Sequence, residues 1–228
     1  MAGTISDWVI EMENKGLGSL AKAFHSEKVE DQKRLRKSGL PVYADFQTTY
    51  AEFNSDNIEL TQFLRRYSKV VIRALPNTRK FPRRYKIGVA GFENCKEFLE
   101  REVLPENAGL YRVLLSEWQP DKRSGIIISR LDSVIAEVSD AGLDAFSHGA
   151  EPTAGCLIDF WKVGHRENKT TWRGKENERS LILRALDAIE LSRDSFNPYY
   201  RRGYFEFLET QKGELKFLDY KINKAYLR

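Results

Sequence analysis

The sequence has few of the residues that build disulfide frameworks or zinc sites. Its 228 residues include two cysteines, Cys95 and Cys156, and three histidines. No CxxC pair and no cluster of histidines occurs along the chain. This scarcity argues against a structural zinc site or a disulfide framework, and it favours a reducing compartment.

Long apolar runs and targeting signals are missing as well. No apolar stretch approaches the roughly 20 residues that a membrane-spanning helix needs. The first segment, MAGTISDWVIEMENKG, carries acidic residues without a basic stretch, so it does not resemble a secretory signal peptide. The GxxxxGK[ST] motif of P-loop proteins is also absent. We therefore expect a cytoplasmic protein that has no membrane partner and no P-loop.

The composition is that of an ordinary globular protein. Hydrophobic residues make up 41% of the chain and charged residues 31%, which is far from a disordered composition. The net charge of +4 is mild, and basic residues alternate with acidic ones along most of the chain. Such a balance permits nucleic-acid binding but does not require it.

Helix-forming segments come mainly before strand-forming ones. Helical periodicity predicts helices over residues 16–37, 58–67, 92–103 and 180–192. Apolar and alternating runs predict strands over residues 69–75, 111–118, 124–129, 133–138, 155–164, 204–210 and 214–221. Two charged segments, 76–88 and 165–178, are expected to be loops. This order predicts an α+β fold with mostly antiparallel pairing and a terminal hairpin.

The terminal hairpin carries two acidic residues that should meet. Strand alternation puts Glu206 on one face of the first strand, and it puts Phe217 and Asp219 on one face of the second. The polar turn at residues 211–213 should bring Glu206 close to Asp219. Two close carboxylates repel each other unless a cation lies between them, and Mg²⁺ prefers such oxygen ligands. The alternative is the solvated face of an ordinary hairpin.

A second candidate is a basic segment that follows a buried strand. Arg73 lies on this strand, and the segment after it supplies five more basic residues: Arg79, Lys80, Arg83, Arg84 and Lys86. Such a cluster can neutralise a polyphosphate, and arginine suits the bidentate grip on phosphate oxygens. The alternatives are a solvated basic surface or a non-specific nucleic-acid patch.

A third candidate is the segment NKGLGSL, in which Lys15 stands just before the expected start of a helix. Its two glycines leave the backbone free to approach a ligand, and helix N-termini attract anions. The alternative is an ordinary turn at the start of a helix.

In chain order, these segments resemble the N-terminal nucleotide-binding domain of the pyruvate phosphate dikinase and phosphoenolpyruvate synthase family, which has an ATP-grasp fold. NKGLGSL resembles the family's glycine-rich loop, SGLPVYADF its GLPVPxGF segment, VVIRALP its arginine-bearing strand, and the terminal hairpin its metal-binding strands. The resemblance implies a single ATP-grasp-like unit over residues 1–228. Its two α+β lobes, about 1–110 and 111–228, would enclose a nucleotide cleft with mostly antiparallel sheets.

Position by position, the resemblance implies a site for ATP and Mg²⁺. Lys15 and Arg73 would contact phosphates, and Glu117 would lie at the adenine or ribose edge. Glu206 and Asp219 would hold Mg²⁺, and Lys221 would be a phosphate-binding basic residue. With the basic segment included, Arg84 and Lys86 complete the expected nucleotide-binding set, and Arg73 and Lys221 are expected to stabilise the charge of the transition state.

The chain departs from the family in ways that leave its activity open. Ala74 and Leu75 replace the serine pair that follows the strand arginine, and Asp219 stands where many members have glutamine. The swivelling phosphohistidine domain and the pyruvate-handling barrel have no counterpart in these residues. Three hypotheses remain. The first is phosphoryl transfer to, or activation of, an unidentified acceptor, which a separate partner protein could carry. The others are a catalytically idle regulatory subunit of the same fold and a nucleic-acid-binding protein that uses the basic segment.

Overall fold

The computed structural model describes residues 28–55, 57–77, 81–142, 152–159, 169–174, 176–194 and 197–222. These residues form two compact units. The four-stranded unit is Tyr43–Pro120, and the six-stranded unit combines the described residues up to Val42 with those from Asp121 onward. The units therefore divide after Val42 and after Pro120, whereas a single division near residue 110 was expected.

The four-stranded unit is an antiparallel sheet in the order β1-β4-β2-β3. Its strands are β1 Asp45–Thr49, β4 Tyr111–Glu117, β2 Val70–Pro76 and β3 Arg84–Val89. Its helices are α4 Tyr50–Phe53, α5 Ile58–Arg66, α6 Gly91–Glu102 and the 3₁₀ turn η1 Pro105–Leu110. The helices pack on one face of the sheet through a core that includes Phe53, Leu60, Ile72, Phe98, Leu99 and Leu115.

Local signals explain where these helices begin. Thr49 and Glu52 form a capping box at α4, in which the Glu52 backbone N–H donates to the Thr49 hydroxyl (3.1 Å). At α5, the backbone N–H of Leu60 donates to Asn57 Oδ1 (3.0 Å). The expected helices over 58–67 and 92–103 are confirmed as α5 and α6.

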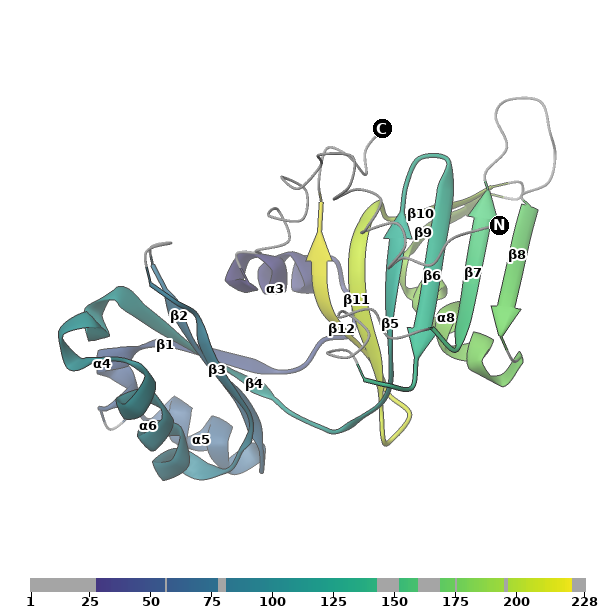
Figure 1. Cartoon of the computed structure of the whole chain (residues 1–228). Coiled ribbons are helices and arrows are strands. Elements are labelled where there is room, and N and C mark those ends of the chain that lie inside the picture. Colours follow the sequence, from purple (N-terminus) through teal and green to yellow (C-terminus); the bar gives the residue numbers. More distant parts are fainter. Residues whose placement is uncertain are drawn as a thin grey trace. The chain divides into compact units, whose positions relative to one another are not determined.

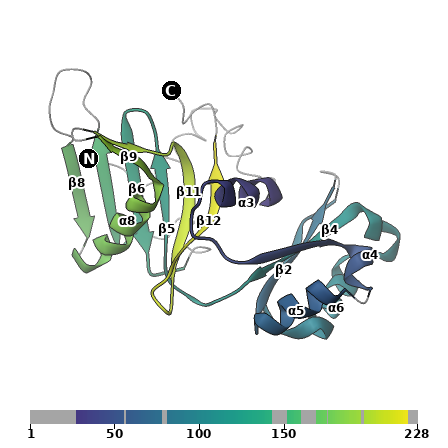
Figure 2. The same cartoon turned by 180° about the vertical axis from the view of Figure 1, so that it is seen from behind.

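The six-stranded unit is an antiparallel sheet in the order β12-β11-β5-β6-β7-β8 (Figure 1). In this order the strands are Leu215–Lys221, Gly203–Thr210, Asp121–Ser129, Ser133–Ser139, Ala154–Asp159 and Lys169–Gly174. Helix α8, Glu176–Ile189, crosses one face of the sheet, and helix α3, Lys28–Lys37, lies beside β12 (Figure 2). A separate two-stranded ladder joins β9, Glu190–Asp194, to β10, Asn197–Tyr200.

The core of this unit lies between α8 and the sheet. The helix contributes Leu181, Ile182, Ala185, Leu186 and Ile189, and the sheet contributes residues such as Ile127, Val134, Ala136, Val138, Phe205, Phe207 and Phe217. Gly125 on β5 leaves room for the ring of Phe207, which a Cβ at residue 125 would run into. The sheet residues of alternate parity, including Ile126 and Glu206, therefore face away from α8.

The segment before β1 belongs to this unit because it pairs with its edge strand. The backbone N–H of Phe217 donates to the carbonyl of Pro41 (2.7 Å), and Val42 forms a parallel bridge with Phe217. Arg34 on α3 also donates to the carbonyl of Tyr220 (3.1 Å). These long-range bonds explain why the chain up to Val42 groups with the C-terminal strands rather than with β1.

The α+β class with antiparallel sheets is confirmed, but two expected loops contain strands. Residues 84–89 of the first segment form β3, and residues 169–174 of the second form β8. Both are edge strands, where charged side chains reach water on the open side, so their charge did not prevent pairing. The expected helix over 180–192 begins at Glu176 and ends at Ile189, where β9 follows. Of the expected helix over 16–37, residues 28–37 are helical, and the rest lies outside the described residues.

Among the helices that the structure describes, none combines the length and the apolar character that crossing a bilayer requires.

Candidate functional site

The hairpin of β11 and β12 brings Glu206 and Asp219 directly opposite each other, as the sequence predicts. The expectation that Phe217 shares a face with Asp219 is wrong. A bulge after Glu206 places Phe207 opposite Phe217, which leaves Leu218 as the extra residue on β12. The bulge turns Phe217 into the core under α8 and leaves Asp219 on the opposite face of the sheet.

Four residues of the hairpin form a closed arrangement on the face away from α8, which we call the acid face square. Its members are Tyr204 and Glu206 on β11, and Asp219 and Lys221 on β12. Tyr204 lies opposite Lys221, and Glu206 lies opposite Asp219. The square therefore consists of two neighbouring cross-strand pairs on one face of the sheet. Alternation along each strand places all four on one face, because members of the same strand are two residues apart.

Polar contacts connect the members of the square. Lys221 Nζ lies 3.2 Å from Asp219 Oδ2. The same ammonium lies over the Tyr204 ring, 5.5 Å from its centroid. The Tyr204 hydroxyl donates to Glu206 Oε1 (2.9 Å). The Asp219 and Lys221 side chains are only 4% and 13% exposed. Two carboxylates and one ammonium thus share a site that is largely shielded from water and carries one net negative charge.

A third acidic residue, Glu137, lies on the same face and was not expected from the sequence. Glu206 pairs with Ile126 on β5, and Ile126 pairs with Glu137 on β6, so Glu137 lies in the same row as the carboxylate pair. Glu137 is 2% exposed. Its side chain lies toward Gly155 on β7, since its Cγ would be 3.5 Å from a Cβ at residue 155. A single glutamate within the apolar run SVIAEV was the available signal, because glutamate is almost never fully buried unless it is paired.

The carboxylate pair fits the expected Mg²⁺ only in part. Within the described ranges, no group of three or more histidine, cysteine, aspartate or glutamate side chains could hold a metal ion. Mg²⁺ is nevertheless commonly held by one or two carboxylates together with phosphate oxygens and water. Glu206 and Asp219 therefore fit a metal that arrives with a phosphate-bearing ligand rather than a cage made by protein alone.

The four-stranded unit separates the expected phosphate-binding residues onto two faces of its sheet. Arg73 on β2 is half-buried, pairs with Tyr85 and Leu114, and donates to the Ser116 hydroxyl (3.1 Å) on the face away from the helices. Arg84 and Lys86 alternate with Tyr85 on β3, so they lie on the helix-covered face. The expected grouping of these three residues around one ligand is thus not formed within the sheet.

Arg84 and Lys86 both lie near helix α6. Arg84 Nε lies 3.7 Å from Glu102 Oε2 at the end of α6. Burial raises the pKa of the Cys95 thiol on α6 to about 12, and the positive charge of Lys86 opposes this shift. Arg84 and Lys86 therefore border the helix layer of this unit, and their roles toward a nucleotide stay predictions.

The remaining expected ligand contacts lie elsewhere. Glu117 ends β4, and its Oε1 accepts a hydrogen bond from Gln119 Nε2 (2.7 Å). The next residue, Trp118, lies over the ammonium of Lys69 and against Gly88. Lys15, like Arg79 and Lys80 of the basic segment, lies outside the described residues. The structure thus positions the Glu117 carboxylate at the end of its unit, just before the chain crosses to β5.

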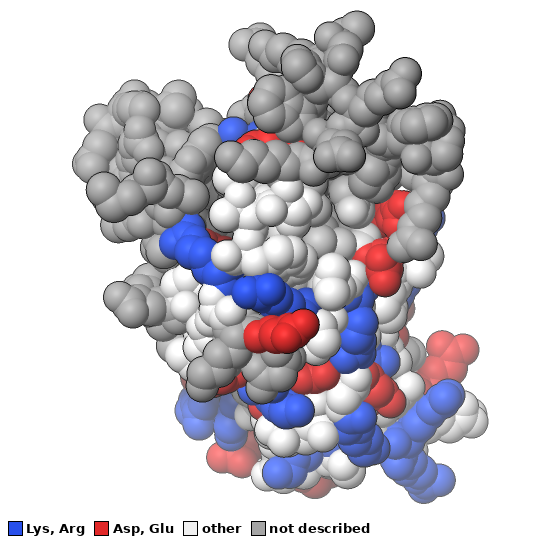
Figure 3. Space-filling model, turned by 90° about the vertical axis from the view of Figure 1, so that its right-hand side faces the viewer, with Lys and Arg blue, Asp and Glu red and all other residues white. Residues whose placement is uncertain are grey.

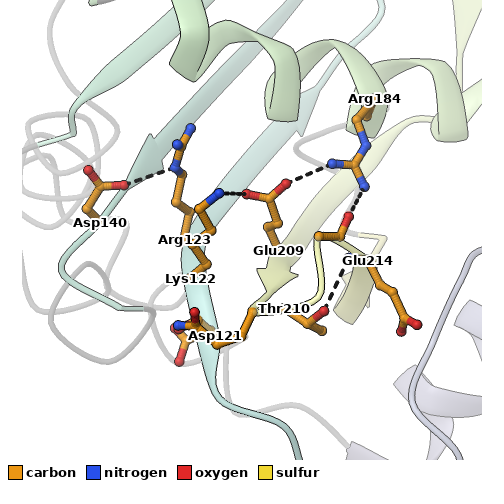
Figure 4. Close-up of polar contacts among 10 residues, drawn as sticks. Asp121, Lys122, Arg123, Asp140, Arg184, Glu209, Thr210 and Glu214 are labelled. Atoms are coloured by element: carbon orange, nitrogen blue, oxygen red, sulfur yellow. Dashed lines mark hydrogen bonds and ion pairs between the residues drawn. The ribbon is translucent and has the colours of Figure 1, made fainter.

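A second charged cluster joins the hairpin to α8 and has a structural role (Figure 4). Glu209 on β11 accepts a hydrogen bond from Arg184 Nη1 (2.9 Å) and lies 3.7 Å from Lys122 Nζ. Arg184 Nη2 also donates to the carbonyl of Gly213 in the hairpin turn (2.7 Å). These contacts fix the turn against the helix. They lie on the α8 side of the sheet, so Glu209 is separate from the acid face square.

Charge of both signs is mixed over the surface shown in Figure 3. Among the described residues drawn there, Lys and Arg side chains form a row across part of the face, and Asp and Glu side chains lie directly beside it. Non-specific nucleic-acid binding relies on a row of basic groups that follows the phosphates. The acidic side chains beside this row give the face a mixed charge, which by itself does not favour the nucleic-acid hypothesis.

Comparisons with known proteins find likeness only among solved structures. No model of a known protein family matches the chain, and no curated protein matches it. The chain is similar to a D-alanine-D-alanine ligase from Coxiella burnetii, with 11% identity, a TM-score of 0.45, and coverage of 89% of this chain and 49% of the ligase. It is also similar to a carboxyaminoimidazole ribonucleotide synthase from Aspergillus clavatus complexed with ATP (12% identity, TM-score 0.45, 87% of this chain and 45% of that chain).

A third similar structure is an ATP-grasp ligase from Chryseobacterium gregarium in complex with ADP and a leader and core peptide. It shares 14% identity with a TM-score of 0.43, over 85% of this chain and 51% of that chain. The chain thus spans about half the length of the solved structures it matches. Because these TM-scores lie below 0.5, the proposals below rest on the sequence and on the geometry of the described residues.

Proposed function

We propose that the chain binds a nucleoside triphosphate through the acid face square, in the manner of an ATP-grasp protein. ATP is the first candidate. The observation that carries the proposal is the pairing of Glu206 with Asp219 on the sheet face away from α8, with Lys221 beside them. The sequence resemblance to ATP-grasp nucleotide-binding domains supports the same ligand class.

The chemistry of the square suits a triphosphate. When bound, Mg²⁺ would neutralise phosphate oxygens and polarise the phosphorus centre. Glu206 and Asp219 would supply its carboxylate ligands, and the Lys221 ammonium would donate to a phosphate oxygen. Tyr204 holds the Glu206 carboxylate in place through its hydroxyl. The proposed contacts of Arg73 with phosphate and of Glu117 with the base or ribose are separate proposals, tested by ATP titration of Arg73→Gln and of Glu117→Gln.

We further propose that the bound nucleotide serves phosphoryl transfer or activation of an acceptor. The carboxylates of the square are assigned to the metal and Tyr204 holds Glu206 through its hydroxyl, so the acceptor would come from a substrate or from a partner protein. The nucleotide half-reaction of phosphoenolpyruvate synthase and a ligase-type activation both begin with this bound nucleotide and differ in the acceptor. Chromatographic separation of AMP from ADP after incubation with candidate acceptors distinguishes them.

Calorimetric titration of ATP with and without Mg²⁺ tests the binding proposal. The wild type should bind ATP more tightly with Mg²⁺, and Glu206→Gln should lose this dependence because the amide removes one anionic ligand. Glu214→Gln is the matched control, since Glu214 lies on the same hairpin and its exposed carboxylate lies 3.2 Å from Lys216 Nζ. ATP binding that is unaffected by Mg²⁺ and by Glu206→Gln would refute the proposal.

A further inference from the structure

The acid face square contains its own cation. Lys221 lies two residues after Asp219 on β12, which places both side chains on one face. Its ammonium is 3.2 Å from Asp219 Oδ2 and is enclosed on one side by the Tyr204 ring. The lysine side chain is only 13% exposed, so water screens its charge weakly. The position next to the carboxylates is thus taken by a fixed positive charge.

A divalent ion held by the pair would compete with this ammonium for Asp219. A cation placed between Glu206 and Asp219 would lie within a few ångströms of Lys221 Nζ, because Glu206 and Asp219 are direct neighbours across the ladder and Nζ contacts Asp219. Like charges at such a distance repel strongly where water is largely excluded. When a phosphate group accepts a hydrogen bond from the ammonium, its negative charge offsets this repulsion, because the anion neutralises both cations.

We propose that Lys221 is a built-in counter-cation that excludes divalent metal from the carboxylate pair until a phosphate-bearing ligand takes over its ammonium. The inference rests on the proposed function for the identity of that ligand. It goes beyond that function by assigning Lys221 a gating role toward the metal. It also accounts for why the pair lacks a third protein ligand among the described residues, because the missing charge and oxygen atoms arrive with the phosphates.

Binding of Mn²⁺ alone, followed by electron paramagnetic resonance without nucleotide, tests the gating role. Lys221→Gln removes the charge but keeps a hydrogen-bond donor for Asp219. We expect this variant to bind Mn²⁺ at least about tenfold more tightly than the wild type, which corresponds to removing one nearby positive charge in a partly shielded site. Lys221→Met should give the same gain, and adding Asp219→Asn to Lys221→Gln should abolish it.

Lys122→Gln is the control, because Lys122 lies 3.7 Å from Glu209 on the α8 side of the sheet, away from the square. It should bind Mn²⁺ as the wild type does. Equal Mn²⁺ affinity in the wild type, Lys221→Gln and Lys221→Met would overturn the inference. If loss of the ammonium unfolds the hairpin, circular dichroism gives a second measurement. Mn²⁺ should then restore the fold of Lys221→Gln, and failure to do so contradicts a counter-cation role.

The two proposals fail in different experiments. Titration of ATP into the wild type tests nucleotide binding whatever Lys221 does to metal. Titration of Mn²⁺ without nucleotide tests the gating role whatever the protein does with ATP. An enhanced Mn²⁺ site in Lys221→Gln without ATP binding in the wild type would support the counter-cation and remove the nucleotide as its partner.

Discussion

The ion pair between Lys221 and Asp219 makes a quantitative prediction about folding stability. Asp219 is 3% exposed as a residue, and its partner ammonium lies 3.2 Å away. Removing one partner of a buried ion pair typically costs about 3–5 kcal/mol, because the other charge stays buried without compensation. Asp219 keeps the hydrogen bond from the Tyr220 backbone N–H (3.1 Å), which favours the lower end of this range.

We therefore expect Lys221→Met to lower the free energy of unfolding by about 3 kcal/mol. Methionine is an unbranched side chain of similar length without the charge, so the loss reports mainly on the ammonium and its contacts with Asp219 and the Tyr204 ring. Asp219→Asn alone should also destabilise the fold, since it leaves the ammonium beside a neutral amide. The double variant removes both charges together, and its loss should be smaller than the two single losses combined by at least about 2 kcal/mol.

Urea unfolding followed by circular dichroism, in buffer with a chelator and without nucleotide, measures these differences. The dependence of the unfolding free energy on urea should be the same in all four proteins, which shows that the same surface is exposed on unfolding. Lys216→Met serves as control for losing a partly exposed lysine from the same strand. Single losses that simply add, with a coupling below about 0.5 kcal/mol, would show that Lys221 and Asp219 do not act as a pair.

Two further predictions concern the α8 side of the hairpin and the thiols. Arg184→Ala should lower the unfolding free energy by about 1–2 kcal/mol, because Glu209 loses its 2.9 Å hydrogen bond while the arginine is already 42% exposed. Arg184→Lys should restore part of this stability. An unchanged urea midpoint would contradict the proposal that Arg184 fixes the hairpin against α8. Burial raises the pKa of both Cys95 and Cys156 from 9.0 to about 12. Since the unfolded thiols ionise near pH 9 and the folded ones do not, these residues should stabilise the fold fully below pH 9 and lose that contribution as pH rises from 9 to 12. Replacing both by alanine should flatten that part of the pH profile of urea midpoints, and an unchanged profile would contradict the assignment.

The pairing within the hairpin could be predicted from the sequence because it depends on neighbouring residues only. A polar turn between two alternating strands determines which residues face each other, and this brought Glu206 opposite Asp219. The bulge at Leu218 was not foreseen, since alternation alone gives no sign of an inserted residue. It decides that Phe217 enters the core while Asp219 stays on the other face.

Residues whose surroundings come from distant strands were harder to place. Arg73, Arg84 and Lys86 lie close in sequence, yet the register of β2 with β3 puts them on opposite faces. Glu137 joins the row of the carboxylate pair only because β5 lies between β6 and β11. The order of strands in a sheet depends on long-range pairing, which short sequence patterns do not contain. Charge also misled the assignment of β3 and β8, because an edge strand tolerates charged side chains that an interior strand would exclude.

We propose above that the pair of Glu206 and Asp219 holds the cation of a bound nucleotide. Anomalous diffraction from crystals grown with ATP and Mn²⁺ tests it most directly, because the signal locates the metal without assuming a binding site. We expect a peak between the two carboxylates, with triphosphate density beside Lys221. Bound nucleotide with its Mn²⁺ elsewhere in the protein, and no peak at this pair, would contradict it.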